Sequence, residues 1–255
     1  MKKIFTIRDL SQQQAHMWDG VSIGNEVSNC PEWRIIRCFE KYLPEDKLIL
    51  EAGSGIGTWL IYLRDKGYNI EGVEHDRNAV VRLKEFRQDI PVRVGDIRDL
   101  PYDDNSLGAY ISLGVLEHFE EGAEQPLLEA RRVLMPGGII VLTVPFNNLF
   151  RRIFAHPLRD LYLMIKGSKH FAEYRYSKKE ACDMLAKAGF HLMETGTEDF
   201  ISKDRSLVLW SEFPFLRKDK GSYSLNMPGR IAAYCMNSIS YDILSAGILV
   251  VGRKV

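Results

Sequence analysis

One segment constrains the fold of this chain more than any other: an apolar run that ends in an acid and is followed by three glycines at alternating positions. Residues 47–51 are typical of a buried strand, and residues 58–66 are typical of a helix. Gly53, Gly55 and Gly57 lie between them. Alternating glycines let the backbone turn sharply and leave bare main chain beside a ligand. Since the helix that follows offers free N–H groups, the unit predicts a site for a nucleotide-type ligand.

Glu51, two residues before the first glycine, separates two interpretations of this loop. The dinucleotide-binding fingerprint G-x-G-x-x-G has its third glycine three residues after the second. Here the spacing is G-x-G-x-G, and position 58 is Thr. A carboxylate at the lip repels a pyrophosphate and attracts a cationic group. A nucleotide-cofactor oxidoreductase is therefore disfavoured, although it stays an alternative.

Two more acids follow predicted strands. Glu74 ends the stretch 69–74 and lies roughly 20 residues past the glycines, where an acid binds ribose hydroxyls in βαβ units. A carboxylate accepts two O–H bonds from a diol at once. Asp76 is expected to cap the helix 77–87 rather than to contact ligand. Asp96 follows the next strand, and an Asx-turn there is compatible with a binding role.

In this order the motifs resemble those of the class I S-adenosylmethionine-dependent methyltransferases, in the ubiquinone- and menaquinone-biosynthesis-like, type 11 branch. The first family motif, D/E-x-G-x-G-x-G, matches residues 51–57. The stretches G-D-x-x-x-L-P at 95–101, L-E-H at 116–118 and R-V-L-M-P-G-G at 132–138 also match. The resemblance covers residues 47–145.

The resemblance implies an α/β fold: a Rossmann-like, seven-stranded, mostly parallel sheet with helices on both faces and an antiparallel last strand. Alternating strands and helices also favour a mostly parallel sheet. We expect an N-terminal arm or cap at 1–46 and a methyltransferase domain at 47–255. Lid or substrate insertions are expected at 146–176 and 198–245.

The resemblance further implies S-adenosylmethionine as cofactor, with S-adenosylhomocysteine as product. In that family the acid matched by Glu51 helps to hold the methionine ammonium. Glu74 would bind the ribose, Asp96 the adenine amino group, and the N–H of Ile97 the adenine ring. The other residues expected in the cofactor site are Gly53, Ser54, Gly55, Gly57, His75 and Leu113.

Methyl transfer is an in-line displacement, so the protein mainly aligns the acceptor with the methyl group. An oxygen acceptor of high pKa also needs a base. His118 is our candidate, because the end of the fourth strand faces the methyl group in this fold. The alternative is that Glu117 and His118 only brace the cofactor loop. His170, Tyr174 and Tyr176 are the next candidates, with ordinary aromatic packing as the alternative.

The segment 146–169 combines apolar positions at helical spacing with basic residues, and only Asp160 opposes them. A break is expected at His156-Pro157. A basic amphipathic helix lies on an anionic membrane surface. We favour a lid packed on the protein over this membrane contact, and a third hypothesis is a lid that admits a lipid-linked acceptor. The basic residues are Arg151, Arg152, Arg159, Lys166 and Lys169.

Composition excludes some functions. The 255 residues carry a formal net charge of zero, which disfavours a broad grip on nucleic acid. The four cysteines lack metal-ligand spacing, so we expect no metal and a reducing compartment. With no signal peptide or apolar span, a cytoplasmic location is expected, and peripheral membrane contact stays open. The sequence does not choose between a small-molecule, sugar or lipid-linked acceptor. A catalytically silent binding protein remains an alternative.

Overall fold

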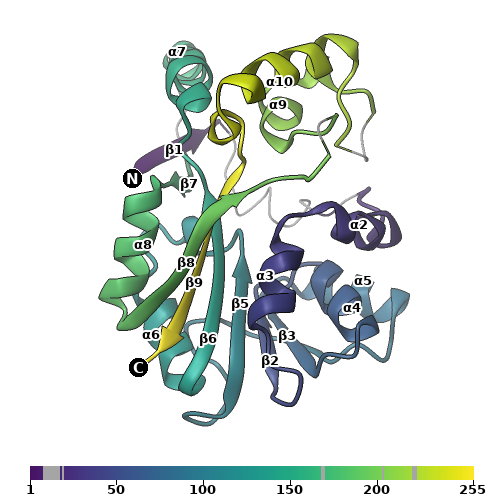
Figure 1. Ribbon diagram of the computed structural model, residues 1–255, viewed down its shortest axis with the longest axis vertical. Helices are drawn as coiled ribbons and strands as arrows, with labels where there is room; N and C mark the ends of the chain where they lie inside the picture. Colours follow the sequence, from purple (N-terminus) through teal and green to yellow (C-terminus); the bar gives the residue numbers. More distant parts are fainter. Residues whose placement is uncertain (8–17, 19, 168–169, 203, 220–222) are drawn as a thin grey trace.

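The computed structural model describes residues 1–7, 18, 20–167, 170–202, 204–219 and 223–255. In this part of the chain the strands form one seven-stranded and one two-stranded sheet. The large sheet has the order β4-β3-β2-β5-β6-β9-β8 (Figure 1). Its strands are β2 (Ile49–Ala52), β3 (Ile70–Glu74), β4 (Val92–Val94), β5 (Leu107–Leu113), β6 (Leu134–Pro145), β8 (Phe190–Glu198) and β9 (Gly247–Lys254).

The direction of the strands confirms the predicted fold class. Strands β4, β3, β2, β5 and β6 pair in parallel. The last strand, β9, pairs antiparallel with both of its neighbours, β6 and β8. Because the first five strands run the same way, their carboxyl ends meet at one edge of the sheet. Ligands of open α/β sheets bind outside that edge.

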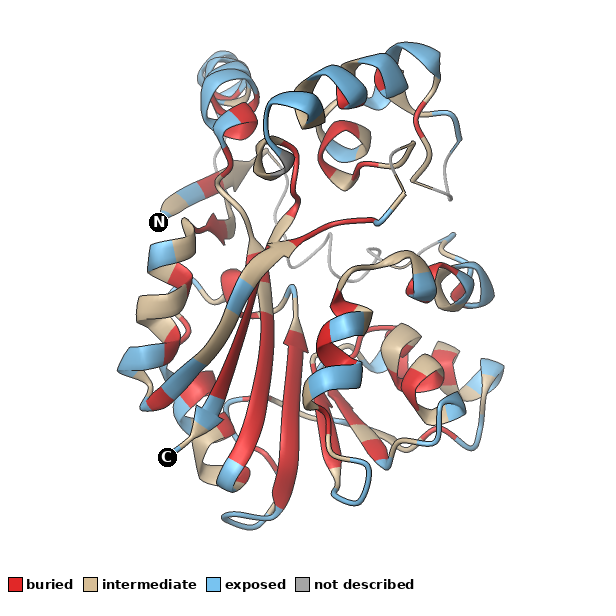
Figure 2. Cartoon of the chain, viewed as in Figure 1, coloured by how far each residue is buried: buried red, intermediate tan, exposed pale blue. Residues whose placement is uncertain are grey.

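Alternate residues of the central strands face opposite sides of the sheet, and each side has its own apolar core. The central strands β5 and β6 are buried along most of their length (Figure 2). In β5, Tyr110 belongs to one core, whereas Ala109 and Ile111 belong to the other. One side is covered by α6 (Glu124–Val133) and α8 (Lys178–Lys187). The other is covered by α3 (Ile35–Tyr42), α4 (Thr58–Asp65) and α5 (Arg77–Phe86). The predicted cap of α5 is confirmed: Asp76 accepts from the N–H of Asn78.

A cap stands over the carboxyl edge. Strand β1 (Lys2–Thr6) pairs antiparallel with β7 (His170–Arg175), a pairing that the sequence did not indicate. A third apolar core lies inside the cap and includes Phe150, Leu209 and Ala233. The remaining helices are α2 (Ile23–Asn29), α7 (His156–Lys166), α9 (Leu207–Glu212) and α10 (Met227–Ile239), with short turns η1 (Cys30–Glu32), η2 (Leu116–His118), η3 (Arg151–Ala155), η4 (Pro214–Leu216) and η5 (Tyr241–Ile243).

The expected break at His156-Pro157 is wrong. The π-helix η3 runs directly into α7, and His156 donates its N–H to the carbonyl of Arg151. Pro157 lies in the first turn of α7, where its missing N–H removes no hydrogen bond of that helix. The segment is therefore one continuous helical rod.

Asp160 is the one acid within this segment, but an acid from outside it pairs with two of its basic residues. Arg151 is buried, and its Nε lies 3.2 Å from Oε1 of Glu212. Arg159 lies 2.8 Å from the other oxygen of Glu212. This acid belongs to α9, more than fifty residues along the chain, so the local pattern does not contain it. Lys169 lies outside the described residues.

Candidate functional site

The loop between β2 and α4 has a shape that glycine adopts without strain. Gly53, Gly55 and Gly57 have φ angles of +79°, +54° and +77°, in the left-handed region. The N–H of Gly53 bonds to the carbonyl of Val73 at 2.8 Å, which ties the loop to β3. The glycines therefore lay bare main chain across the carboxyl edge of the sheet.

Trp18 covers part of this loop, which the sequence did not indicate. A Cβ added at Gly55 would lie 2.5 Å from the Trp18 ring. Arg82 of α5 fixes the backbone there, because its guanidinium donates to the carbonyls of Trp18 and Val21. The tryptophan stood out only as an aromatic residue in the N-terminal arm, and no local spacing links it to the glycines.

Glu51 is buried at the lip of the loop, and its Oε2 has no hydrogen-bond partner among the described residues. Burial, followed by the nearby charge of Glu74, holds the pKa of Glu51 well above its usual value. The hydroxyl of Ser54 is also buried without a partner in this part of the chain. Since buried polar atoms normally find partners, the two side chains form a polar place prepared for a ligand. A cationic group there would restore the charge of Glu51.

Glu74 ends β3, and its carboxylate oxygens contact three neighbouring groups. Its Oε2 accepts from the N–H of Gly55 at 2.7 Å, and its Oε1 accepts from the N–H of Asp76 at 2.8 Å. The same Oε1 lies 2.9 Å from Nδ1 of His75. Burial favours the neutral acid, but the hydrogen bonds from His75 and the backbone outweigh it and lower the pKa of Glu74. The hydrogen bond with Glu74 raises the pKa of His75. Glu74 is thus an ionised strut that braces the glycine loop.

Asp96 follows β4 in a tight turn. Both of its carboxylate oxygens contact the guanidinium of Arg98, and Oδ1 also accepts the Arg98 N–H at 2.8 Å. This pair lowers the pKa of Asp96. Asp96 and His75 also interact electrostatically, which places the ends of β3 and β4 together. Ile97, the next residue, is buried.

His118 lies in η2, just beyond the end of β5 that carries Leu113. Its Nδ1 lies 2.9 Å from the carbonyl oxygen of Ala172 in β7. A carbonyl only accepts, so Nδ1 carries the proton of this hydrogen bond. In the neutral ring Nε2 is then the nitrogen that can take a proton. The neighbouring strand thus fixes both the orientation and the tautomer of the ring.

Glu117 is a further buried acid at this edge. From the sequence, its expected role was only to brace the cofactor loop. Its Oε2 has no partner within the described residues, and burial raises its pKa well above the usual value. The other oxygen is turned toward Gly114, where an added Cβ would lie 3.5 Å away. The signal was present in the sequence, since an acid between apolar Leu116 and a candidate base is unusual.

The three other candidates for the base, Tyr174, Tyr176 and His170, lie in different environments. Tyr174 and Tyr176 are buried, and their rings pack 6.3 Å apart. His170 is exposed at the start of β7. The described part of the chain contains no group of three or more His, Cys, Asp or Glu side chains placed to hold a metal ion. At the carboxyl edge of the sheet lie the glycine loop, four acids and one histidine of fixed orientation. These are Glu51, Glu74, Asp96, Glu117 and His118.

Known proteins with similar sequences fit this arrangement. Residues 50–142 match the model of a family described as a methyltransferase domain. A probable S-adenosylmethionine-dependent methyltransferase of Mycolicibacterium smegmatis is 29% identical over 58% of this chain and 53% of its own length. An uncharacterised 37.1 kDa protein of Streptomyces fradiae is 34% identical over 40% of this chain and 30% of its own. The chain thus spans about half, or less, of the curated relatives it matches.

Solved structures share the fold. One belongs to a complex between the Haloferax volcanii Trm112 methyltransferase activator and a putative methyltransferase; it is 19% identical, covers 97% of both chains and has a TM-score of 0.63. Another, an S-adenosylmethionine-dependent methyltransferase from Methanosarcina mazei, is 16% identical, covers 86% of this chain and 97% of its own, and has a TM-score of 0.61. The sheet topology of this chain agrees with that shared fold. Residues 50–142 are thus a methyltransferase domain of the kind found in class I S-adenosylmethionine-dependent methyltransferases of the type 11 branch.

Proposed function

We propose that this protein transfers a methyl group from S-adenosylmethionine to a lipid-linked acceptor that it reaches from a membrane surface. The observation that supports the cofactor most directly is Glu51, a buried acid with an unpartnered oxygen beside the glycine loop. When bound, the cofactor would supply an activated methyl group on a sulfonium: the acceptor would bond to the methyl carbon in line as the carbon–sulfur bond breaks, with S-adenosylhomocysteine as the leaving group.

The cofactor would lie along the carboxyl edge. Glu51 takes the ammonium, with Ser54 beside it, and the main chain of Gly53, Gly55 and Gly57 lies against the ligand. Glu74 already accepts three hydrogen bonds, and a carboxylate has about four lone-pair sites, so one site remains for a ribose hydroxyl while Glu74 braces the loop. Asp96, the N–H of Ile97 and the nearby His75 would bind the adenine end of the cofactor. Leu113 would line the methyl end.

His118 would act as the base for an oxygen acceptor. The carbonyl of Ala172 keeps the proton on Nδ1 and leaves Nε2 able to remove a proton from the acceptor as the new bond forms. The neighbouring β7 also carries Glu173, which interacts electrostatically with His118. The imidazolium formed during the reaction would therefore face an acid.

The outer face of the helical segment supports the membrane part of the proposal. Large apolar side chains stand in solvent along η3 and α7, whereas Phe150 and Leu163 point inward and are buried. Arg152 and Lys166 are exposed on the same rod. One side of this rod packs on the protein, and the other side is apolar with basic residues beside it. Such an outer face is typical of a helix that binds an anionic bilayer. The exposed apolar residues are Leu149, Ile153, Phe154, Leu158, Leu161, Tyr162, Met164 and Ile165.

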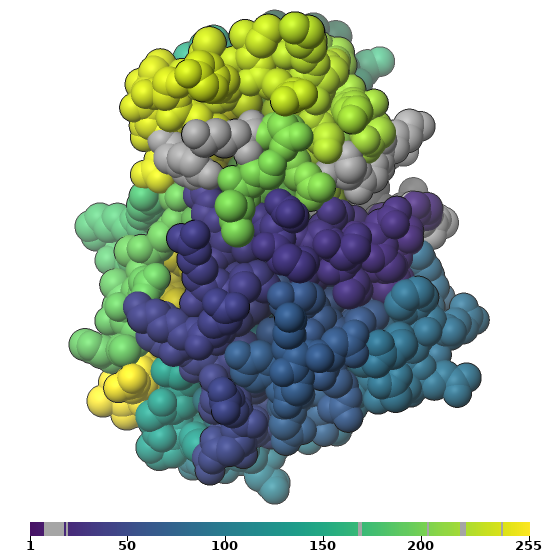
Figure 3. All heavy atoms as spheres, turned by 45° about the vertical axis from the view of Figure 1, so that its right-hand side comes forward, coloured from purple at the N-terminus to yellow at the C-terminus, as the bar shows by residue number. Residues whose placement is uncertain are grey.

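Helix α10 extends this surface at the same end of the molecule, where it forms the top of the cap (Figure 3). Its exposed apolar side chains include Ile231, Tyr234 and Ile239, and Arg230 stands among them. No helix in the described residues is both long and apolar enough to cross a bilayer. The contact we propose is therefore with the bilayer surface.

The cofactor is tested first, by calorimetric titration with S-adenosylmethionine, S-adenosylhomocysteine and, as a control, NAD. Binding of the first two without NAD is expected, and binding of NAD alone would favour an oxidoreductase. Tritiated S-adenosylmethionine is then incubated with the protein and a bacterial lipid extract or a water-soluble extract. Label in the lipid fraction supports the proposed acceptor. Cofactor binding with no transfer to either extract would favour a silent binding protein.

The membrane contact is tested by flotation with vesicles of phosphatidylcholine and phosphatidylglycerol. The double variant Leu158→Ser, Ile165→Ser should lose flotation, because it removes apolar area from the exposed face without touching a buried residue. Leu128→Ser on α6 is the control, since Leu128 is also an exposed leucine but lies outside the cap. Failure of the unaltered protein to float, or equal flotation of all three, would overturn the contact.

A further inference from the structure

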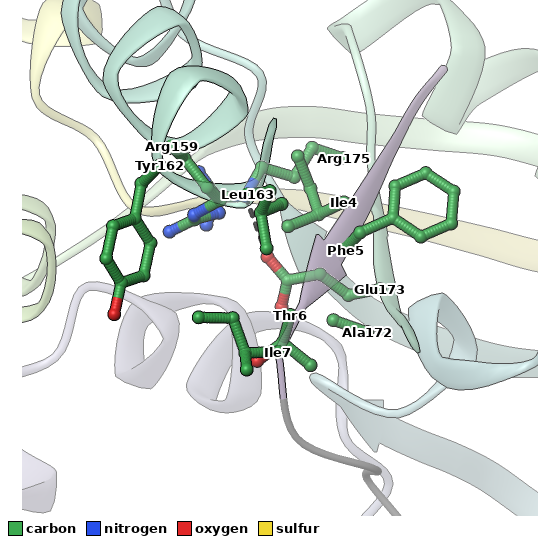
Figure 4. Close-up of a pocket in the computed structure, with 10 residues that line it drawn as sticks. All are labelled: Ile4, Phe5, Thr6, Ile7, Arg159, Tyr162, Leu163, Ala172, Glu173 and Arg175. Atoms are coloured by element: carbon green, nitrogen blue, oxygen red, sulfur yellow. Dashed lines mark hydrogen bonds and ion pairs between the residues drawn. The ribbon is translucent and has the colours of Figure 1, made fainter. Parts of the chain in front are cut away.

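A cavity of about 410 Å³ lies between β1, α7 and β7, apart from the glycine loop (Figure 4). Apolar side chains of β1 and of the residue that follows it close one side, and Tyr162 and Leu163 of α7 close another. Charged side chains also line it: Arg159 from α7, and Glu173 and Arg175 from β7. An apolar cavity with a few convergent polar groups is typical of a small-ligand site.

The charges around the cavity do not balance. Arg175 lies 2.7 Å from Glu173, and its Nη1 lies 2.8 Å from Glu212, at an angle that does not make a hydrogen bond. Arg151 and Arg159 share the same Glu212. Three guanidinium groups thus face two carboxylates, which leaves one positive charge in excess.

Arg159 is the residue that presents the excess positive charge to the cavity. Arg151 and Arg175 are buried, whereas the Arg159 side chain is 28% exposed. Of the described residues, Glu212 is its one ion-pair partner, reached through a single nitrogen. A guanidinium has five N–H donors, so most of its fork is available to a ligand.

The local potential agrees with this count. His156 lies beside the cluster, with Nε2 2.9 Å from Oδ1 of Asn147. Burial, and then the positive charges of Arg175 and Arg159, lower the pKa of His156 to about 4. The charges of Arg175 and Arg159 thus add to the effect of burial on His156, and they would attract an anion.

The cavity also adjoins the proposed base. Ala172 lines it, and the carbonyl of Ala172 accepts the hydrogen bond from His118. A ligand anchored in the cavity therefore lies one residue from the group that would remove its proton.

We propose that this cavity binds the phosphate group of the acceptor, with Arg159 as the exposed anchor and Arg175 behind it. Guanidinium forks match phosphate oxygens, and the apolar walls would take the adjoining carbon atoms. This assignment rests on the proposed function, since it gives the lipid-linked acceptor its anionic part.

The test is calorimetric titration of the whole protein with two probes, inorganic phosphate and dihexanoyl phosphatidic acid. Arg159→Gln should weaken binding by about tenfold or more, because a charged hydrogen bond is lost. Arg159→Lys should recover part of the loss. Arg152→Gln is the matched control: it removes an exposed arginine from the same rod, outside the cavity, and should change binding less than twofold.

The outcomes separate the sources of the phosphate. Binding of both probes that depends on Arg159 supports a site for the phosphate group itself. Binding of phosphatidic acid alone, again dependent on Arg159, supports a lipid head group. No binding of either probe, or equal affinity of Arg159→Gln and the unaltered protein, would overturn the proposal. The titrations are repeated with S-adenosylmethionine absent and present, so failure of the cofactor site is seen independently.

Discussion

The sheet edge and the cap bury charge in opposite ways. At the sheet edge Glu51 and Glu117 are buried, and each has one carboxylate oxygen without a partner in the described residues. In the cap Glu212 is surrounded by three guanidinium groups, those of Arg151, Arg159 and Arg175. An unpartnered buried acid costs stability, so its presence indicates a binding requirement. A fully paired acid indicates a requirement of the fold. Neutralising the two kinds of acid should therefore have opposite consequences.

The largest effect is expected in the cap. Glu212→Ala leaves buried guanidinium groups without compensation, and it should lower the free energy of unfolding by about 3–5 kcal/mol. Urea unfolding measures the loss. The control is Glu120→Ala, an exposed acid paired with Lys3, which should cost less than about 0.5 kcal/mol. Equal effects of the two variants would contradict the assignment of Glu212 to the fold.

The next effect concerns the glycine loop. Gly55→Val should abolish cofactor binding, because a side chain is strained at a φ of +54° and would collide with Trp18. We expect affinity for S-adenosylmethionine to fall more than about a hundredfold, roughly 3 kcal/mol, by calorimetry. Gly196→Val in β8 is the control, since an added Cβ there meets nothing within 4 Å. Affinity of Gly55→Val near that of the control would refute the assigned site.

Glu51→Gln sharpens the comparison, because its two effects should have opposite signs. Loss of the charge weakens cofactor binding by about 1.5–3 kcal/mol. The free energy of unfolding without cofactor should stay level or rise, since an unpartnered buried acid has been removed. Calorimetry and urea unfolding measure the two quantities. A fall in stability with unchanged affinity would make Glu51 a structural residue.

The last effect is a pH dependence at Glu198, at the end of β8. Burial raises the pKa of Glu198 to about 8, although its carboxylate accepts the N–H of Ile35. Between its unfolded pKa and about 8 the folded protein holds a proton that the unfolded chain has released. This contribution to stability is fully present below the unfolded pKa and is lost as pH rises, by at most about 1.4 kcal/mol per pH unit.

Urea unfolding on either side of neutral pH checks this dependence. Glu198→Gln cannot ionise, so the decline of stability between about pH 5 and pH 8 should flatten in that variant. A decline of the same steepness in both proteins would show that other groups are responsible.

Whether a feature could be predicted from the sequence depends on how far apart its interacting residues lie along the chain. The glycine loop, the acids at the strand ends and the Asp76 cap are each encoded within a few neighbouring residues, and the fold class followed from their order. The ion cluster of the cap was not predictable, because Glu212 and Arg151 are brought together only by tertiary packing. The same holds for Trp18 against Gly55 and for the pairing of β1 with β7. The hydrogen bond to Ala172 likewise gives His118 a tautomer that the L-E-H motif alone could not.

The place of β9 has a consequence for how the chain is made. Strand β9 is synthesised after β8 but lies inside the sheet, between β6 and β8. In the described residues β8 reaches the rest of the sheet through β9 alone. Roughly 50 residues, which include most of the cap, must emerge between the two strands, and that takes several seconds at ordinary rates of synthesis. During that time β8 and the open side of β6 are exposed edges, and the nascent protein is vulnerable to aggregation until β9 joins the sheet.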